Sequence, residues 1–318
     1  LFLSFILLVP RGRQIEIAGN KQPFINLSLK RSRDMKILSL LVNLIFFWRK
    51  KKSVVPVVRL SGVISAAPSL RRGLSLESIE PQLKKAFSVR SARAVALIIN
   101  SPGGSPVQSA LIANRIRELS KDKEIPVYCF IEDLAASGGY WLSCAADKIY
   151  SMESSIIGSI GVISAGFGAV EAIKKIGIER RVYSQGKNKG LLDPFLPEKK
   201  DDVKQILTIQ KDLHAQFINW VKKRRGKRLK GSDDELFNAG IWSGASAEKL
   251  GLIDGIGDYY TVMKSKFGKE VKFKDFTKKQ SWFKQKFGLS SSGKLNHDFI
   301  ENTIDVIEKR ILWGKYGL

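Results

Sequence analysis

Continuous apolar runs recur along the chain from about residue 53 onward. Most are rich in β-branched residues and end near Gly, Pro, Asn or Asp, which is the pattern of a strand buried on both faces. In the first half of the chain we expect four such strands, at Val54–Ile64, Ala94–Asn100, Val127–Glu132 and Lys148–Met152. The last of these runs is the shortest.

Amphipathic segments separate these runs. In Leu76–Val89, for example, Leu76, Ile79, Leu83 and Phe87 recur at helical spacing. Strands that alternate with helices in units of about 30 residues favour a parallel sheet built from βαβ crossovers, and so an α/β fold. Two more helices are expected in this half, at Pro106–Leu119 and Ser137–Asp147.

The second half of the chain predicts more helix than strand. A Gly-rich stretch, Gly158–Val170, leads into a helix that ends near Ile176, and a short strand is expected at Arg181–Ser184. Residues 198–224 predict a long amphipathic helix, because apolar residues repeat there at intervals of three and four. Later helices are expected within Trp242–Asp254, Gly257–Phe267 and Asn296–Trp313.

Positive charge gathers at the two ends of the chain. The net charge is +24, and residues 1–52 hold 11 Lys and Arg against 2 Asp and Glu, while residues 264–318 hold 13 against 6. This distribution suits contact with anionic lipid headgroups, and solubilising basic tails are an equal alternative. The residues between these two ends show no stripe of basic residues interleaved with aromatic residues, so we expect no nucleic-acid partner.

The first 52 residues read as a leader. The apolar segment Lys36–Trp48 is about a dozen residues long and meets a basic cluster, which favours an interfacial membrane anchor over a full span. Translation could begin at Met35, which would leave residues 1–34 outside the protein. We therefore expect three parts: a leader at 1–52, a main domain at 53–268 and a basic tail with a terminal helix at 269–318.

The two cysteines and two histidines limit the kinds of catalytic or metal site that the chain can form. Cys129 and Cys144 both lie in apolar runs and are expected to be buried free thiols, and their spacing suggests no metal site or other cofactor. His214 lies within the long amphipathic helix and His297 in the basic tail, so both are interpreted as surface or packing residues. A serine hydrolase built from this chain would need another base, and a neutral lysine can serve.

Three glycine-marked segments carry candidate chemistry. Ser137, in AASGGYW, lies where a strand meets a helix, and the loop Asn100–Gly104 directly follows a buried strand. The third segment, Gly186–Lys189, holds two lysines. Taken singly, each has a plainer interpretation: a serine that caps a helix, a Pro-Gly-Gly turn and a solvated loop lysine.

Taken together, five motifs in this order resemble the signal peptide peptidase A family of Ser/Lys proteases. The resemblance runs from about Val55 to Tyr260. The motifs are IINSPGGSP, DLAASGGYWLSCAADKI, GSIGVI, GKNKG with the following DPF, and WSGASAEKLGLIDGIG.

The resemblance implies a role for particular residues. The family's nucleophile falls on Ser137, its general base on Lys189, and its lysine-orienting hydroxyl on Ser159. Family members usually carry an aromatic residue where this chain has Asn188, so Lys187 remains an alternative base. The backbone N–H groups of Gly138 and of Gly103 or Gly104 would form the oxyanion hole.

The resemblance also implies a fold and a setting. The fold would be the ClpP/crotonase type, a βαβ superhelix with mostly parallel sheets and flanking helices. The activity would be hydrolysis of peptides at or in the membrane, such as cleaved signal peptides, by homo-oligomeric rings that complete active sites between neighbours. We expect association with the inner membrane of a bacterium. The positive-inside rule would place the domain on the cytoplasmic face of that membrane, whereas the resemblance to the family would place it on the outward, periplasmic face.

Two other functions remain open at this point. A crotonase-type acyl-CoA hydratase or isomerase would use similar backbone N–H groups on a thioester, typically with acidic side chains. A catalytically silent scaffold bound to the membrane through its basic ends is the other alternative, and the presence of both Ser137 and Lys189 argues against it.

Overall fold

The fold is seen in a computed structural model that describes residues 53–66, 73–186, 188–277 and 313–316. The expected anchor at Lys36–Trp48, the start at Met35 and almost all of the expected helix Asn296–Trp313 lie outside the described residues. Within the described part of the chain, no helix has the length and hydropathy that a bilayer span requires.

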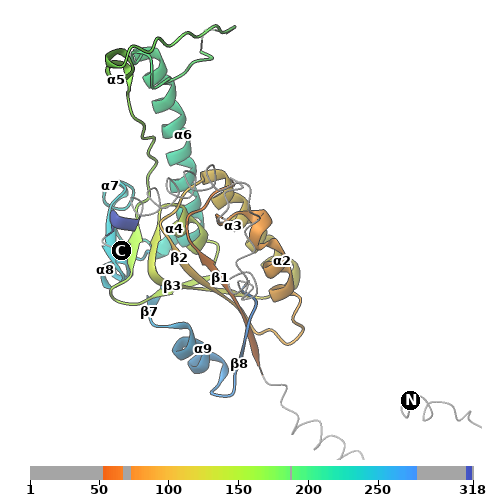
Figure 1. The fold of residues 1–318 in the computed structure, drawn as a ribbon. Helices are drawn as coiled ribbons and strands as arrows, with labels where there is room; N and C mark the ends of the chain where they lie inside the picture. The colour runs from red at the N-terminus through yellow and green to blue at the C-terminus, as the bar shows by residue number, and fades with distance from the viewer. Residues whose placement is uncertain (1–52, 67–72, 187, 278–312, 317–318) are drawn as a thin grey trace, which may run out of the picture. The chain divides into compact units, whose positions relative to one another are not determined.

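A mostly parallel sheet forms the centre of the fold (Figure 1). Its main path runs β6-β5-β3-β2-β1-β8, while β4 pairs with β3 and β7 with β4. Among the described strands, only the pairing of β5 with β6 is antiparallel. The strands are β1 (Val54–Ser61), β2 (Val95–Ser101), β3 (Val127–Ala136), β4 (Lys148–Ser151), β5 (Ile156–Gly158), β6 (Ile241–Ser243), β7 (Gly255–Ile256) and β8 (Lys272–Asp275).

Strand β3 changes partner along its length. Its first half pairs with β4 and its last three residues pair with β5. Between these two halves its register against β2 shifts, because Ile99 faces Ile131 whereas Ser101 faces Ala135. The extra residues bend β3 at that point, so that it reaches β5 just before it ends.

Helices cover both faces of the sheet. α2 (Leu76–Phe87), α3 (Pro106–Lys123) and α4 (Gly138–Ser143) pack with the larger of two apolar cores, and α9 (Tyr259–Phe267) packs with the smaller core through Met263. Strand residues alternate between these cores, as the two-residue period of a strand requires. Two short helices, α7 (Asp233–Leu236) and α8 (Gly244–Lys249), and a turn of 3₁₀ helix, η1 (Gly226–Arg228), complete this layer.

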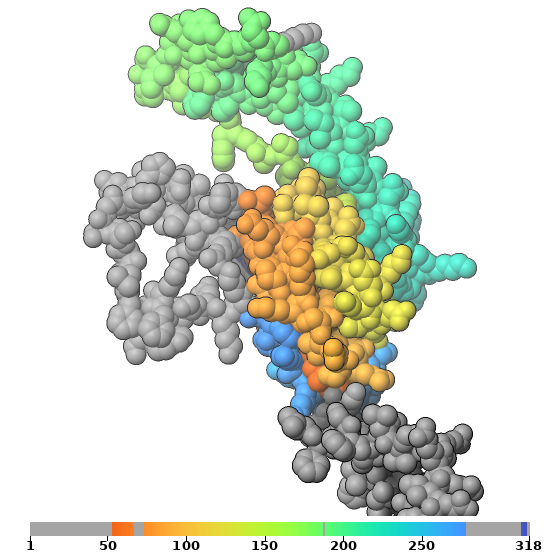
Figure 2. All heavy atoms as spheres, turned by 90° about the vertical axis from the view of Figure 1, so that its right-hand side faces the viewer, coloured from red at the N-terminus to blue at the C-terminus, as the bar shows by residue number. Residues whose placement is uncertain are grey.

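The long helix α6 (Lys200–Arg225) only partly belongs to this body. Phe217, Val221 and Arg225 are buried, whereas the first half of the helix is largely exposed. Residues 163–199, which we call the arm, run from the body to the far end of α6, where α5 (Val170–Lys175) lies (Figures 1 and 2). With a rise of about 1.5 Å per residue, α6 spans about 39 Å.

The α/β fold with a mostly parallel sheet and flanking helices is confirmed. The expected strand Arg181–Ser184 is wrong: these residues are exposed and irregular, because no neighbouring strand pairs with them. The helix expected at Ser137–Asp147 ends at Ser143.

Candidate active site

Ser137 lies at the tight turn between β3 and α4. Its backbone has φ 50° and ψ −119°, a conformation that costs a non-glycine residue about 1–3 kcal/mol. The turn is held at both ends, since the Ser137 N–H donates to Gly158 O (2.8 Å) and its carbonyl accepts from the Trp141 N–H (3.0 Å). The Ser137 hydroxyl makes no capping hydrogen bond to α4, so it is not a helix cap. This geometry is that of a nucleophile elbow.

The Gly103–Gly104 loop packs directly against this turn. Gly103 has φ +101°, and a Cβ there would lie 2.8 Å from Gly138 N and 2.9 Å from Ser137 Cβ. A Cβ on Gly104 would lie 2.1 Å from Ile64 O. Both positions therefore require glycine, and the loop lies beside the nucleophile.

A buried serine organises the same loop. The Ser101 hydroxyl donates to Gly62 O (2.7 Å) and accepts from the Gly103 N–H (3.2 Å). Because the Gly103 N–H is already bonded, Gly104 is the better oxyanion donor of the two. Ser101 was not singled out from the sequence, where a serine after an apolar strand carries no distinctive signal.

Ser159 lies beside Ser137. It directly follows β5, and Gly158 of that strand pairs with Ala136 of β3, so the two serines leave neighbouring strands at the same level. Ser159 also has a positive φ, 52°, and its N–H donates to Gly240 O (2.7 Å). The structure thus brings together Ser137, Ser159 and the predicted glycines.

Lys189 is not part of this cluster within one chain. It lies in the exposed arm, where its N–H donates to Gly186 O (3.1 Å). The arm is tied to the start of α6 by the Leu192 N–H, which donates to Asp202 Oδ2 (3.2 Å). Fifteen residues of helix, about 22 Å, separate Asp202 from Phe217, where α6 becomes buried in the body. Lys187 lies outside the described residues.

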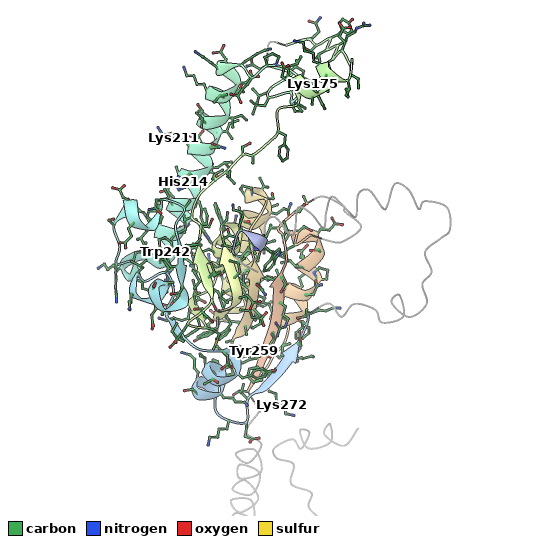
Figure 3. All side chains as sticks on the ribbon, turned by 60° about the vertical axis from the view of Figure 1, so that its left-hand side comes forward. Lys175, Lys211, His214, Trp242, Tyr259 and Lys272 are labelled. Atoms are coloured by element: carbon green, nitrogen blue, oxygen red, sulfur yellow. The ribbon has the colours of Figure 1, made fainter. Side chains whose placement is uncertain are left out.

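His214 contacts the site from α6, just above the body in Figure 3. Its Nε2 lies 3.0 Å from Ile160 O, one residue beyond Ser159. From the sequence alone His214 is interpreted as a surface or packing residue. The helical repeat shows which face of α6 it lies on, but not that it meets the carbonyl of a residue far away in the sequence.

The two thiols are buried and free, as expected. Burial raises the pKa of Cys129 to about 12 and that of Cys144 to about 11, so both stay protonated at neutral pH. Across the described residues, no three His, Cys, Asp or Glu side chains cluster closely enough to hold a metal ion.

These features define the class first: an α/β protein with a mostly parallel sheet and a strained serine at a strand–helix turn. Comparison with known proteins gives the family. Residues 119–272, which include Ser137, Ser159 and Lys189, match peptidase family S49. Over this segment, the match confirms the resemblance to signal peptide peptidase A.

Two relatives and one solved structure illustrate the likeness. The Na(+)/H(+) antiporter NhaA of Brucella melitensis is 44% identical over 279 residues, which cover 85% of this chain and 38% of that protein. Protease 4 of Haemophilus influenzae is 33% identical over 208 residues, which cover 64% of this chain and 33% of that protein. The chain thus spans less than two fifths of either relative. A variant of the 1510-N membrane-bound stomatin-specific protease in complex with a substrate peptide aligns with a TM-score of 0.45 and 14% identity, covering 74% of this chain and 96% of that one.

Proposed function

We propose that the chain is a serine endopeptidase with a Ser/Lys dyad that acts on peptides at or in the membrane, such as cleaved signal peptides. One observation carries this proposal: the strained Ser137 lies between Ser159 and the Gly103–Gly104 loop. A nucleophile needs such a sharp turn, and the nearby N–H groups of Gly104 and Gly138 suit a developing oxyanion. The S49 match supports the same chemistry.

In the proposed mechanism, Ser137 Oγ attacks the peptide carbonyl carbon while its proton passes to the neutral amine of Lys189. The Ser159 hydroxyl orients that amine. The lysine then gives the proton to the leaving amine as the peptide bond breaks, and water hydrolyses the acyl-enzyme. A lysine acts as a base only when uncharged, which burial between protein surfaces favours.

The base would come from a neighbouring copy of the chain. Within one chain Lys189 lies beyond the exposed half of α6, and about 18 Å of helix separates Asp202 from His214, which contacts the body. A ring in which the arm of each copy reaches the Ser137 of the next would complete every site. The largely exposed arm, with Phe167 at 91% and Tyr183 at 92% exposure, offers apolar surface for such contact.

Mixing variants tests both the dyad and its assembly. Ser137→Ala and Lys189→Ala should each abolish hydrolysis of a fluorogenic peptide by the detergent-solubilised protein. When the two inactive variants are mixed and reassembled, about a quarter of neighbouring pairs regain an intact site, so about a quarter of wild-type activity should return. Full activity in both single variants would refute the dyad. Activity that stays absent after subunit exchange would place both groups in one chain.

Two other functions have less support. A crotonase-type reaction would call for a free acidic side chain, yet Glu132 pairs with Arg59 (2.5 Å) and Asp133 accepts from Asn100 (2.6 Å). The antiporter name belongs to relatives of which this chain covers 38%, and ion transport has no need of a strained serine beside an oxyanion loop.

A further inference from the structure

One face of α6 docks on the body through residues at helical spacing. His214, Phe217, Trp220 and Arg224 recur at intervals of three and four, so their side chains share a face. They contact the body near the two serine turns, whereas Lys211, one turn earlier, is exposed. Figure 3 shows Lys211 further from the body than His214.

The first contact holds the Ser159 turn. A carbonyl oxygen can only accept, so His214 donates from Nε2 to Ile160 O, at 3.0 Å. Ser159 has a strained positive φ, and such a conformation persists only where the surroundings fix it. Gly240 O fixes the N–H side of the turn, and His214 fixes the carbonyl that follows it.

The second contact holds the nucleophile turn. The Trp141 N–H donates to the carbonyl of Ser137, and the carbonyl of Trp141 accepts from Trp220 Nε1 at 3.0 Å. The Trp141 ring also packs against Phe217, with centroids 4.9 Å apart. Just beyond α4, Arg224 Nε donates to Cys144 O at 2.8 Å. Trp141 is thus bonded to the nucleophile on one side and to α6 on the other.

The opposite end of the same helix carries the arm. Asp202, in the first turn of α6, accepts the Leu192 N–H, so the Lys189 loop and the two serine turns are attached to one rigid element. A shift of α6 along its axis would move the lysine and loosen both serine turns together.

We propose that His214 and Trp220 are positioning residues that fix the Ser159 and Ser137 turns against α6. Ser137 becomes fully reactive only when this helix is docked. The proposal rests on the proposed peptidase function and deepens it, because it ties the reactivity of one site to the position of the arm.

Two variants isolate these hydrogen bonds in the full chain. His214→Leu puts an apolar side chain of similar size in place of the donor, and His214→Gln restores a donor. Trp220→Phe keeps an aromatic ring and removes the N–H together with the five-membered ring that carries it. Lys211→Leu, on the same helix but away from the body, is the matched control.

The expected result is a kinetic split. His214→Leu and Trp220→Phe should lower kcat about tenfold or more, because small displacements of reacting groups carry large penalties, while KM stays within about twofold. His214→Gln should recover part of kcat, and Lys211→Leu should match the wild type. Amide hydrogen exchange should speed up at residues 159–161 in His214→Leu and at 138–141 in Trp220→Phe, with the rest of the sheet unchanged.

Other results would overturn the proposal. It fails if kcat in His214→Leu and Trp220→Phe equals that of Lys211→Leu, or if the faster exchange spreads over the whole sheet as in simple destabilisation. If the wild type hydrolyses no peptide, the proposed function fails instead. The local exchange pattern then decides on its own whether α6 holds the two turns.

Discussion

At the scale of single residues, several positive φ angles meet around Ser137, those of Gly103 and Ser159 among them. Gly103, Ser137 and Ser159 have φ values of 101°, 50° and 52°. Only glycine adopts this region freely, so the two serines are held in place by surrounding hydrogen bonds and by the close approach of Gly103. The reactivity of the site therefore depends on backbone fit as much as on its side chains.

Gly103→Ala tests this dependence. The new Cβ would lie 2.8 Å from Gly138 N and 2.9 Å from Ser137 Cβ, so the nucleophile turn must move. We expect kcat for peptide hydrolysis to fall by about a hundredfold or more.

Gly268→Ala is the matched control for that variant. Gly268, at the end of α9, has a similar φ, +93°, with nothing within 4 Å of its added Cβ. It should lose about 1–2 kcal/mol in a urea unfolding measurement from φ strain alone, with kcat nearly intact. Equal kcat in the two alanine variants would contradict the argument from close approach.

Motif order was enough to predict Ser137, Ser159 and the glycine loop as one group, and the structure places them together. Ser101 and His214 escaped prediction. The role of each depends on which backbone carbonyl or N–H it meets across the fold. The orientation of the backbone at that point decides the partner, and residue type does not reveal it.

At the scale of elements, a set of arginines anchors the end of α6. Arg225 is buried and pairs with the equally buried Asp254 at 2.6 Å. Burial by itself raises the pKa of Asp254, but the hydrogen bond and charge of Arg225, helped by the Ile149 N–H and Arg228, leave that pKa below its usual 3.8. This contribution to stability is therefore complete above pH 3.8 and is lost as the pH falls through the lower folded-state value.

Arg225→Met should destabilise the fold by about 3 kcal/mol, because the variant leaves the Asp254 carboxylate buried with weaker partners. The free energy of unfolding in urea measures this loss. Lys223→Met, an exposed neighbour on the same helix, should change stability by less than about 0.5 kcal/mol. Similar values for the two variants would show that the ion pair contributes little.

Long apolar runs and long amphipathic repeats predicted their elements well. β1, β2 and α6 lie almost where the sequence indicates. β5 and β6 have only three residues each, which is too short for periodicity to mark. Residues 181–184 look like a strand but lack a partner, since strand formation depends on pairing as well as composition.

At the scale of the whole molecule, the basic leader predicts membrane contact. Four consecutive positive residues, Arg49 to Lys52, follow the apolar segment. Replacing all four with Gln should reduce co-sedimentation with anionic vesicles by about tenfold or more at low salt, because each basic residue near such a surface adds about 1 kcal/mol. Neutral vesicles provide the control. Undiminished binding of the Gln variant to anionic vesicles would show that these four charges do not contribute to membrane contact.

The three expected parts of the chain and the membrane face remain predictions. The separation of Lys189 from Ser137 within one chain was foreseen only through the family resemblance. Residue spacing along the sequence says nothing of distance in space when a long helix lies between two motifs.

The exposed half of α6 has one further consequence. Helix length is set by residue count at about 1.5 Å each, so the number of residues between Asp202 and His214 fixes how far the lysine loop stands from the serine turns. Insertion of one residue would also rotate the loop by about 100°. In the proposed ring, the length of this solvent-facing stretch would therefore set the spacing and angular phase between neighbouring catalytic centres, although its own side chains take no part in the chemistry.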